Sequence, residues 1–192
     1  MENFILYNPV KLHFGKDITD DLAKTVELYG KRVLLVYGKN AIKENGVYAK
    51  IKAQLKLIHA EVFEYGGIKS NPVIEDVDAA SRLGRNSNTD VVLAVGGGSV
   101  IDSAKIISVT IPVSHSAWDF YSGLKKPEKA IPLIVVLTLA ATGTEMNPYA
   151  VLQNFKSKQK IGWGHTLCYP KHSFLDPQFT LSVPKNYTAY GI

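Results

Sequence analysis

The sequence predicts an α/β fold: a mostly parallel, Rossmann-like sheet with helices on both faces, and a β-rich segment near the C-terminus. Two observations support this prediction. Continuous apolar runs of strand length, such as KRVLLVY at 31–37, alternate with segments whose apolar residues recur at helical spacing. Strands without a polar face are typical of parallel sheets that helices cover on both sides. We therefore expect parallel strands joined by right-handed helical crossovers.

The elements follow from this pattern in chain order. The expected strands cover 3–14 (an edge strand or hairpin), 31–37, 60–65, 90–95, 131–137, 149–153, 159–163 and 172–175. The expected helices cover 41–57, a segment that opens at 71–72, and 99–109. In the second helix Asn71 would act as the N-cap and Pro72 would take the first helical position. A further helix start is expected at 182–185.

Composition narrows the class of protein. The 192 residues are 46% hydrophobic and 20% charged, which is typical of a folded globular chain. The net charge of +5 comes from basic residues spread along the chain, so a solvated surface explains it at least as well as an anionic ligand does. The sequence carries no known nucleic-acid-binding pattern, and nucleic acid is not expected as a partner.

The cysteine content and the apolar runs indicate the compartment. The single cysteine, Cys168, cannot form an internal disulfide, which favours a reducing compartment. The N-terminal sequence lacks the pattern of a signal peptide, and the apolar runs are too short to span a bilayer. We expect a cytoplasmic protein with no membrane partner.

The main chemical motif is the glycine turn LAVGGGSVIDSAK at 93–105. It lies at the carboxyl end of an expected strand and opens a helix, where unpaired amides and the helix dipole attract a phosphate. The alternative is a tight turn in which Ser99 is the N-cap and Asp102 completes a capping-box pair. That alternative explains one of the glycines at 96–98, whereas phosphate binding explains all of them. The turn is neither a P-loop nor the G-x-G-x-x-G fingerprint, in which Ile101 would have to be glycine.

A second turn, LTLAATGTEMNP at 137–148, follows the next expected strand. It offers the hydroxyls of Thr138, Thr142 and Thr144. A Thr-rich loop with side-chain turns is the competing interpretation. Beside the glycine turn, the hydroxyls favour a second contact with a long diphosphate ligand.

A third turn, YGKN at 37–40, follows the first long strand. A dinucleotide site typically carries an acid here for the ribose 2′-hydroxyl. This turn instead has Lys39 and Asn40, so a 2′-phosphate is tolerated, although a solvated lysine is an even alternative. Lys160, in the later strand region, is a further candidate whose alternative is an exposed strand lysine.

Metal and nucleophile chemistry are not expected from the residues of this chain. Its histidines form no H-E-x-x-H or H-x-x-x-H pair, and no G-x-S-x-G elbow occurs. Each histidine is interpreted as structural or exposed.

Four segments together resemble the iron-containing (group III) alcohol dehydrogenase family, in particular its butanol-dehydrogenase-like branch. They are GGGSVIDSAK at 96–105, ATGTEMN at 141–147, NPVIEDV at 71–77 and PKHSFLDP at 170–177. The resemblance runs through the chain in order. Thr144 stands where a serine is commoner in the family, and the hydroxyl is retained. The ATGTEMN form argues against the glycerol-type dehydrogenases and dehydroquinate synthases of the same superfamily.

The resemblance implies a dinucleotide-binding α/β domain at 1–183, followed at 184–192 by the start of an otherwise absent helical metal-binding domain. The implied cofactor-binding residues are Gly38, Asn40, Asn71, Gly96, Gly97, Gly98, Ser99, Asp102, Thr138, Thr142 and Lys160. The turn at 96–99 would hold the pyrophosphate, and both threonines would line the path from the phosphates to the nicotinamide. Asp102 and Lys160 would lie at the nicotinamide end, and the remaining residues along the adenosine half.

The activity implied by the resemblance is the NAD(P)-dependent interconversion of small primary alcohols and aldehydes. The cofactor would be NADP(H) or NAD(H), with Lys39 and Asn40 favouring NADP(H), and the assembly a possible homodimer. In the full-length enzyme a divalent metal, iron or zinc, would be held by one aspartate and three histidines beyond Ile192. This chain alone is then expected to be inactive. The alternative is a non-catalytic dinucleotide-binding module or a truncated product.

Overall fold

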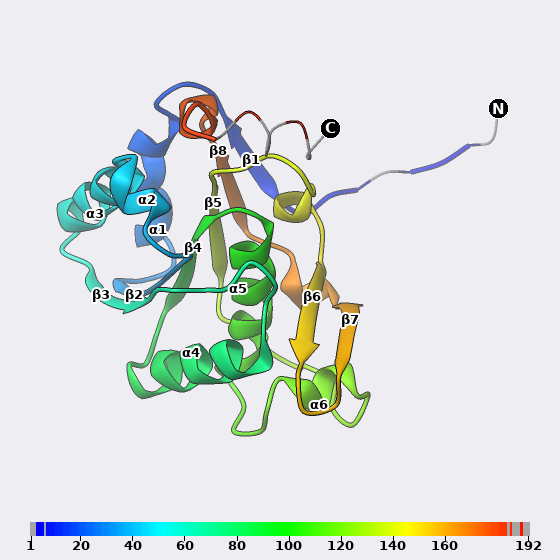
Figure 1. The fold of residues 1–192 in the computed structure, drawn as a ribbon. Helices are drawn as coiled ribbons and strands as arrows, with labels where there is room; N and C mark the ends of the chain where they lie inside the picture. The colour runs from blue at the N-terminus through cyan, green and yellow to red at the C-terminus, as the bar shows by residue number, and fades with distance from the viewer. Residues whose placement is uncertain (1–2, 6, 184, 186–188, 190–192) are drawn as a thin grey trace.

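A six-stranded parallel sheet forms the centre of the protein (Figure 1). The computed structural model describes residues 3–5, 7–183, 185 and 189. The strand order is β1-β8-β5-β4-β2-β3. The strands are β1 (Lys11–Phe14), β2 (Arg32–Tyr37), β3 (Glu61–Tyr65), β4 (Val91–Gly96), β5 (Leu133–Leu137) and β8 (His172–Leu175). The predicted α/β class, with its parallel sheet, is confirmed.

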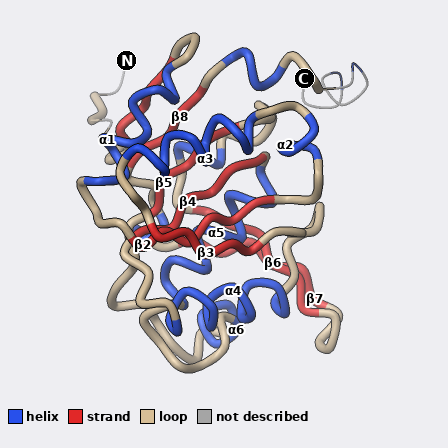
Figure 2. The backbone as a smooth tube through the Cα atoms, turned by 90° about the vertical axis from the view of Figure 1, so that its left-hand side faces the viewer, coloured by secondary structure: helices blue, strands red, loops and turns tan. Residues whose placement is uncertain are grey.

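Helices cover both faces of the sheet, as Figure 2 shows. One layer contains α1 (Leu22–Glu27), α2 (Ala41–Glu44) and α3 (Val47–Leu57); the other contains α4 (Ile74–Asn86) and α5 (Gly98–Thr110). Successive side chains of a strand point to opposite faces. In β2, Val33 and Leu35 pack in the core under the first layer, and Leu34 and Val36 pack in the core under the second. Burial on both faces is why the inner strands β2, β4 and β5 have no polar face.

A second, antiparallel layer lies beyond α5. It is the hairpin of β6 (Tyr149–Asn154) and β7 (Gln159–Gly164), beside the short α6 (Trp118–Tyr121). Two of the three predicted C-terminal strands therefore form the β-rich segment, and the third is β8 of the main sheet. Single 3-10 turns occur at Ile18–Asp21, Thr144–Met146, Thr166–Cys168 and Pro177–Thr180. In the described part of the chain, no helix is long and apolar enough to cross a membrane.

The strand order reverses between β2 and β4. The chain passes from β2 to β3 through α2 and α3 on one face, and from β3 to β4 through α4 on the other face. Because β4 then pairs with the opposite side of β2, the two crossovers diverge there. Such a switch point opens a crevice at the carboxyl ends of the two strands, where ligands of α/β proteins bind.

The helix predicted over 41–57 is wrong in one respect, because it is two helices. α2 ends at Glu44 and α3 begins at Val47. Between them Gly46 has φ +83°, a left-handed conformation that glycine adopts without steric cost. The Asn45 side chain accepts a hydrogen bond from the Val47 amide at 3.2 Å and so starts the second helix. Apolar spacing alone runs through this break.

The helix predicted to open at Asn71-Pro72 begins instead at Ile74. The preceding residue, Val73, is extended and forms a parallel bridge with Gln153 of β6. The Pro72 carbonyl accepts the Gln153 amide at 2.8 Å. Pairing with the hairpin therefore keeps this segment out of the helix, and Asn71 is not an N-cap.

The predicted N-terminal strand is the edge strand β1, paired in parallel with β8. The sequence pattern gave no indication of α1 or α6. Residue 184 of the predicted helix start at 182–185 lies outside the described residues, and so does most of the predicted start of a helical domain at 184–192.

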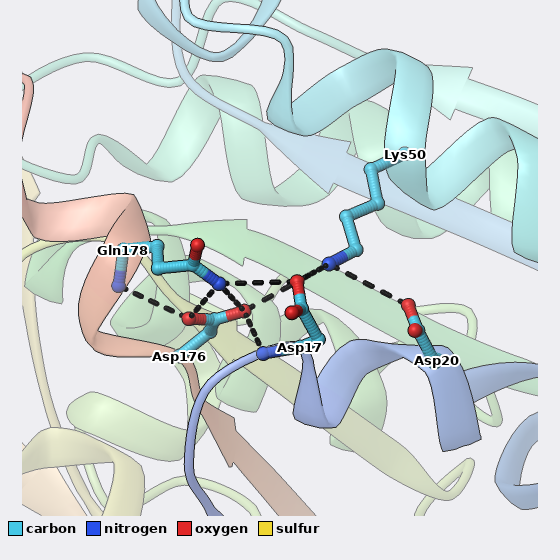
Figure 3. Close-up of polar contacts among 5 residues, drawn as sticks. All are labelled: Asp17, Asp20, Lys50, Asp176 and Gln178. Carbon is cyan, nitrogen blue, oxygen red and sulfur yellow. Dashed lines mark hydrogen bonds and ion pairs between the residues drawn. The ribbon is translucent and has the colours of Figure 1, made fainter.

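A polar clasp ties the N-terminal segment to the chain that leaves β8 (Figure 3). Asp176 is buried, and its carboxylate accepts the amides of Asp17 and Gln178, each at 3.0 Å. The Lys50 ammonium of α3 lies 3.9 Å from the Asp176 carboxylate. It also lies 2.9 Å from the Asp17 carboxylate and 3.5 Å from that of Asp20. A buried carboxylate is tolerated here because backbone amides and an ammonium surround it.

A histidine pair, the half-buried His13 and the buried His172, lies where β1 meets β8. A ring nitrogen of His13 lies 2.9 Å from Nδ1 of His172, whose Nε2 lies 3.0 Å from the Tyr29 hydroxyl of the loop after α1. His13 also stacks on Phe174, with ring centroids 4.2 Å apart. Burial, followed by the charges of His13 and Lys11, lowers the pKa of His172 to about 4.

Acid is expected to destabilise the fold through His172. The unfolded chain takes up a proton near pH 6.5, the ordinary pKa of histidine, whereas the folded chain resists protonation down to about pH 4. Stability from this group is therefore complete above pH 6.5 and is lost as the pH falls through about 4. Between pH 6.5 and about 4, the free energy of unfolding measured in urea should fall by roughly 3 kcal/mol because of His172.

The substitution His172→Gln should flatten the acid dependence of the unfolding free energy. The same exchange at His59, an exposed histidine after α3, should leave the dependence unchanged. An acid loss as steep in His172→Gln as in the wild type would contradict this interpretation.

Candidate functional site

The glycine turn and the two other predicted turns lie together at the carboxyl edge of the sheet. The register pairs Tyr37 of β2 with Val95 of β4, and Gly96 of β4 with Leu137 of β5, so the three strands end at one level. The Thr138 amide donates a hydrogen bond to the Gly96 carbonyl at 3.0 Å. The turns at 37–40, 96–99 and 138–142 are therefore neighbours at the switch point.

Close packing explains why the turn carries glycines. A Cβ added to Gly96 would lie 2.6 Å from Cγ2 of Val100, which real side chains essentially never do. At Gly97 it would lie 3.3 Å from Cβ of Leu139, and at Gly98 3.0 Å from Oγ1 of Thr142. The contacts of Gly97 and Gly98 bring the glycine turn against the Thr-rich turn. The glycines thus bring two loops against each other at the start of α5.

The start of α5 is open to a ligand. Gly97 is the N-cap and has no side chain to cap the helix, and the amides of Val100 and Ile101 are the first to bond back to its carbonyl. Amides before the first helical hydrogen bond have no partner within the helix and attract anions. The residues of its first turn at 97–99 are partly exposed, so the amides of Gly98 and Ser99 are accessible from outside the helix.

The capping-box interpretation of this turn is wrong. The Ser99 hydroxyl donates to the Ser70 carbonyl instead of capping α5. The Asp102 carboxylate accepts the Thr144 hydroxyl at 2.6 Å and the Val151 amide at 2.9 Å. Both side chains therefore tie α5 to other segments, Ser99 to the loop before α4 and Asp102 to the hairpin side.

The loop before α4 extends the site toward the hairpin. Asn71 is next to Ser70, which Ser99 contacts, and its Oδ1 accepts a hydrogen bond from the Lys160 ammonium at 3.0 Å. Both residues are exposed. The structure thus brings Asn71 and Lys160 together, although they are 89 residues apart in the chain.

A polar cleft of about 460 Å³ lies at the end of β2. Its lining residues are Tyr37, Gly38, Lys39, Asn40, Lys43, Gly66 and Gly67. The Lys43 ammonium lies 5.2 Å from the ring centroids of both Tyr37 and Tyr48. Gly38 also approaches α5, because a Cβ added there would lie 3.7 Å from Val100. A basic cleft with a glycine floor therefore borders the start of α5.

A smaller cleft of about 240 Å³ lies between α2, the glycine turn and the Thr-rich turn. It is lined by Ala41, Ile42, Asn45, Gly97, Thr138, Leu139, Ser182 and Val183. The candidate residues thus form a band from the end of β2, across the start of α5, to the Thr-rich turn and the hairpin. Thr142 is exposed on this band and Thr138 is half-buried.

The sequence interpretation missed Lys105 of α5, which is fully buried. Its ammonium donates to Oγ1 of Thr144 at 2.6 Å, Oδ1 of Asn147 at 3.1 Å and the carbonyl of Tyr149 at 2.7 Å. Burial, opposed by the charge of Asp102, lowers the pKa of Lys105 to about 8. A signal existed, because Lys105 follows Ile101 by four residues and so lies on the same face of the helix as a buried apolar residue.

The described residues do not form a metal centre or an activated thiol. No group of three or more His, Cys, Asp or Glu in the described ranges is arranged to hold a metal ion. Cys168 is buried, and burial raises the pKa of its thiol to about 12, so the thiolate is disfavoured.

Comparison with known proteins shows that this chain is similar to dehydrogenases. Residues 9–177 match the family model for iron-containing alcohol dehydrogenase. A probable NADH-dependent butanol dehydrogenase 2 of Bacillus subtilis is 46% identical over the whole chain, which covers 49% of that relative. The NADPH-dependent aldehyde reductase YqhD of Escherichia coli is 35% identical over the whole chain, which covers 50% of it.

A solved structure shows the same fold. The NADH-dependent butanol dehydrogenase A of Thermotoga maritima is 41% identical and superposes with a TM-score of 0.95, over 100% of this chain and 48% of the other. The chain therefore spans about half the length of the relatives it matches.

We expect Gly96→Ala to destabilise the protein more than Gly97→Ala. The added methyl group would overlap the Val100 side chain at 2.6 Å in the first case, but press on Leu139 at 3.3 Å in the second. Overpacking of this kind costs about 1–3 kcal/mol, and the milder contact less than about 1 kcal/mol. Urea denaturation of both variants measures the difference, and equal stability of Gly96→Ala and the wild type would contradict the packing argument.

Proposed function

Because this chain belongs to the iron-containing alcohol dehydrogenase family, we propose that it is the dinucleotide-binding portion of an NAD(P)-dependent alcohol dehydrogenase. The full enzyme would interconvert small primary alcohols and aldehydes. The observation that carries the proposal is the pair of loops, 96–99 and 138–142, that meet at the switch point over the open start of α5. A switch point with a glycine turn and a helix N-terminus is where dinucleotides bind in α/β folds.

The cofactor fits the donor set of this site. The amides of Gly98 and Ser99 would hold the pyrophosphate at the start of α5. The cleft at Gly38 and Asn40 would receive the adenosine, and Thr138 and Thr142 would face the phosphates from the second loop. The exposed pair of Asn71 and Lys160 would lie beside the bound dinucleotide, with Asp102 toward its ribose on the nicotinamide side.

The residues at the end of β2 favour NADP(H) over NAD(H). Lys39 and Lys43 line the cleft where the adenosine ribose would sit, and two ammonium groups attract a 2′-phosphate. The relatives include proteins named for NADH and proteins named for NADPH, so the family by itself does not decide between them.

In this proposal the dinucleotide supplies or accepts the hydride. The residues of this chain bind it, orient it and hold its phosphates away from bulk solvent. The described residues do not supply a metal-binding group, so we derive no step through a metal. The iron or zinc of the full-length enzyme would take its ligands from sequence outside this chain. A cytoplasmic location and a homodimeric assembly remain predictions.

Calorimetric titration tests the cofactor proposal. We expect this chain to bind NADPH roughly tenfold more tightly than NADH, a difference of about 1.4 kcal/mol. Lys39→Asp should remove that preference, because a carboxylate repels the 2′-phosphate and accepts the 2′-hydroxyl. Lys126→Asp, an equal charge change in an exposed loop, is the control. Binding of neither dinucleotide at millimolar concentration would overturn the proposal.

An assay of turnover tests the other half of the proposal. With added iron or zinc, NADP⁺ and butanol, the chain alone should give no NADPH, because its described residues offer no metal-binding group. Absorbance at the reduced nicotinamide band measures the product. Clear oxidation of butanol would contradict the assignment of the metal ligands to sequence outside this chain.

A further inference from the structure

Lys105 is a buried charge in α5, whose other buried residues are all uncharged. None of its side chain is exposed, and its three N–H groups have three acceptors within 2.6 to 3.1 Å. The acceptors belong to Thr144, Asn147 and Tyr149. All of them lie in one segment that continues the Thr-rich turn. The ammonium therefore fastens that segment at three points from inside the protein.

The Thr144 hydroxyl connects this ammonium to a carboxylate. It accepts a hydrogen bond from Lys105 at 2.6 Å and donates one to Asp102 at 2.6 Å. The other carboxylate oxygen of Asp102 accepts the Val151 amide of β6 at 2.9 Å. The negative charge of Asp102 thus balances the buried positive charge through a shared hydroxyl. Hydrogen bonds in such a chain polarise and strengthen one another.

Asn147 extends the network back toward the site. Its Oδ1 accepts from Lys105 at 3.1 Å and from the Tyr149 amide at 2.9 Å, and its Nδ2 donates to the Gly143 carbonyl at 2.9 Å. Gly143 has φ +63° and directly follows Thr142, whose hydroxyl adjoins Gly98. An uninterrupted set of contacts therefore leads from the buried ammonium to the loop that faces the start of α5.

We propose that Lys105 is a positioning residue that holds the 138–149 loop against the start of α5, so that Thr138 and Thr142 face the phosphates of the dinucleotide. This inference rests on the proposed function, because it assigns the dinucleotide to that loop. Lys105 itself is fully buried, so it would act through the loop and not by contact with the dinucleotide. Other ionisable groups close to it are Asp102, Glu145 and Cys168.

Loss of the ammonium leaves its three acceptors without their donor and the Asp102 carboxylate without a balancing charge. An unsatisfied buried acceptor is costly, so the loop would move to regain hydrogen bonds. Dinucleotide binding should then weaken, because the proposed site needs the loop to lie against the start of α5. Binding of adenosine alone should not weaken, because the cleft at the end of β2 has no residue from that loop in its lining.

The experiment compares four variants of the full chain. Lys105→Met keeps the length of the buried side chain without its charge. Thr144→Val removes the shared hydroxyl, and Thr144→Ser restores it. Thr110→Val is the matched control, because this buried hydroxyl on the same helix bonds only to the Ile106 carbonyl within α5. Calorimetry gives the affinity for NADPH or NADH, whichever the wild type binds more tightly, and ligand-observed NMR gives the affinity for adenosine.

We expect Lys105→Met and Thr144→Val to weaken dinucleotide binding at least tenfold, with adenosine affinity within twofold of the wild type. Thr144→Ser and Thr110→Val should stay within threefold for both ligands. If Lys105→Met does not fold, the comparison of Thr144→Val with Thr144→Ser tests the inference.

Unchanged dinucleotide affinity in folded Thr144→Val would overturn the inference, and so would an equal loss of adenosine binding, since that indicates general destabilisation. A wild-type chain that binds neither dinucleotide would instead overturn the proposed function, and the inference with it. The wild-type titration therefore separates the two failures.

Discussion

The double burial of the parallel sheet is the constraint on which the rest of this structure depends. Strands β2, β4 and β5, covered by α1–α3 on one face and α4–α5 on the other, have no polar surface between their ends. The polar side chains and free backbone amides that could bind a ligand therefore lie in the turns at the strand ends. Because all the strands of the sheet run in one direction, the turns after β2, β4 and β5 meet at a single edge. The reversal of strand order between β2 and β4 then decides where on that edge a ligand fits.

Helix α5 combines two demands that usually conflict. It packs between the sheet and the β6–β7 hairpin, so ten of its thirteen residues are buried. It also carries Asp102 and Lys105, whose charges are balanced through Thr144. Removing one partner of such a buried pair is more costly than never having had it. The network therefore specifies one arrangement of the Thr-rich loop over the start of the helix.

The sequence pattern predicted the fold well where burial alone decides structure. The four inner apolar strands begin and end within two residues of their predicted limits. The pattern failed where a local backbone state or a distant partner decides. Helical spacing continues through Gly46, whose left-handed conformation divides the helix. Asn71-Pro72 has the residues of a helix start, but pairing with β6 draws the segment out.

The sequence by itself determined the α/β class, the two loops of the candidate site and the family that they resemble. These follow from apolar runs and short motifs, which are properties of neighbouring residues. Only the tertiary structure decided that the glycines at 96–98 serve the packing of two loops as well as access to the helix start. It also decided that Asn71 meets Lys160, and that Lys105 is a buried charge with three partners. The physical reason is that close approach and charge balance depend on residues dozens of positions apart, which no local pattern records.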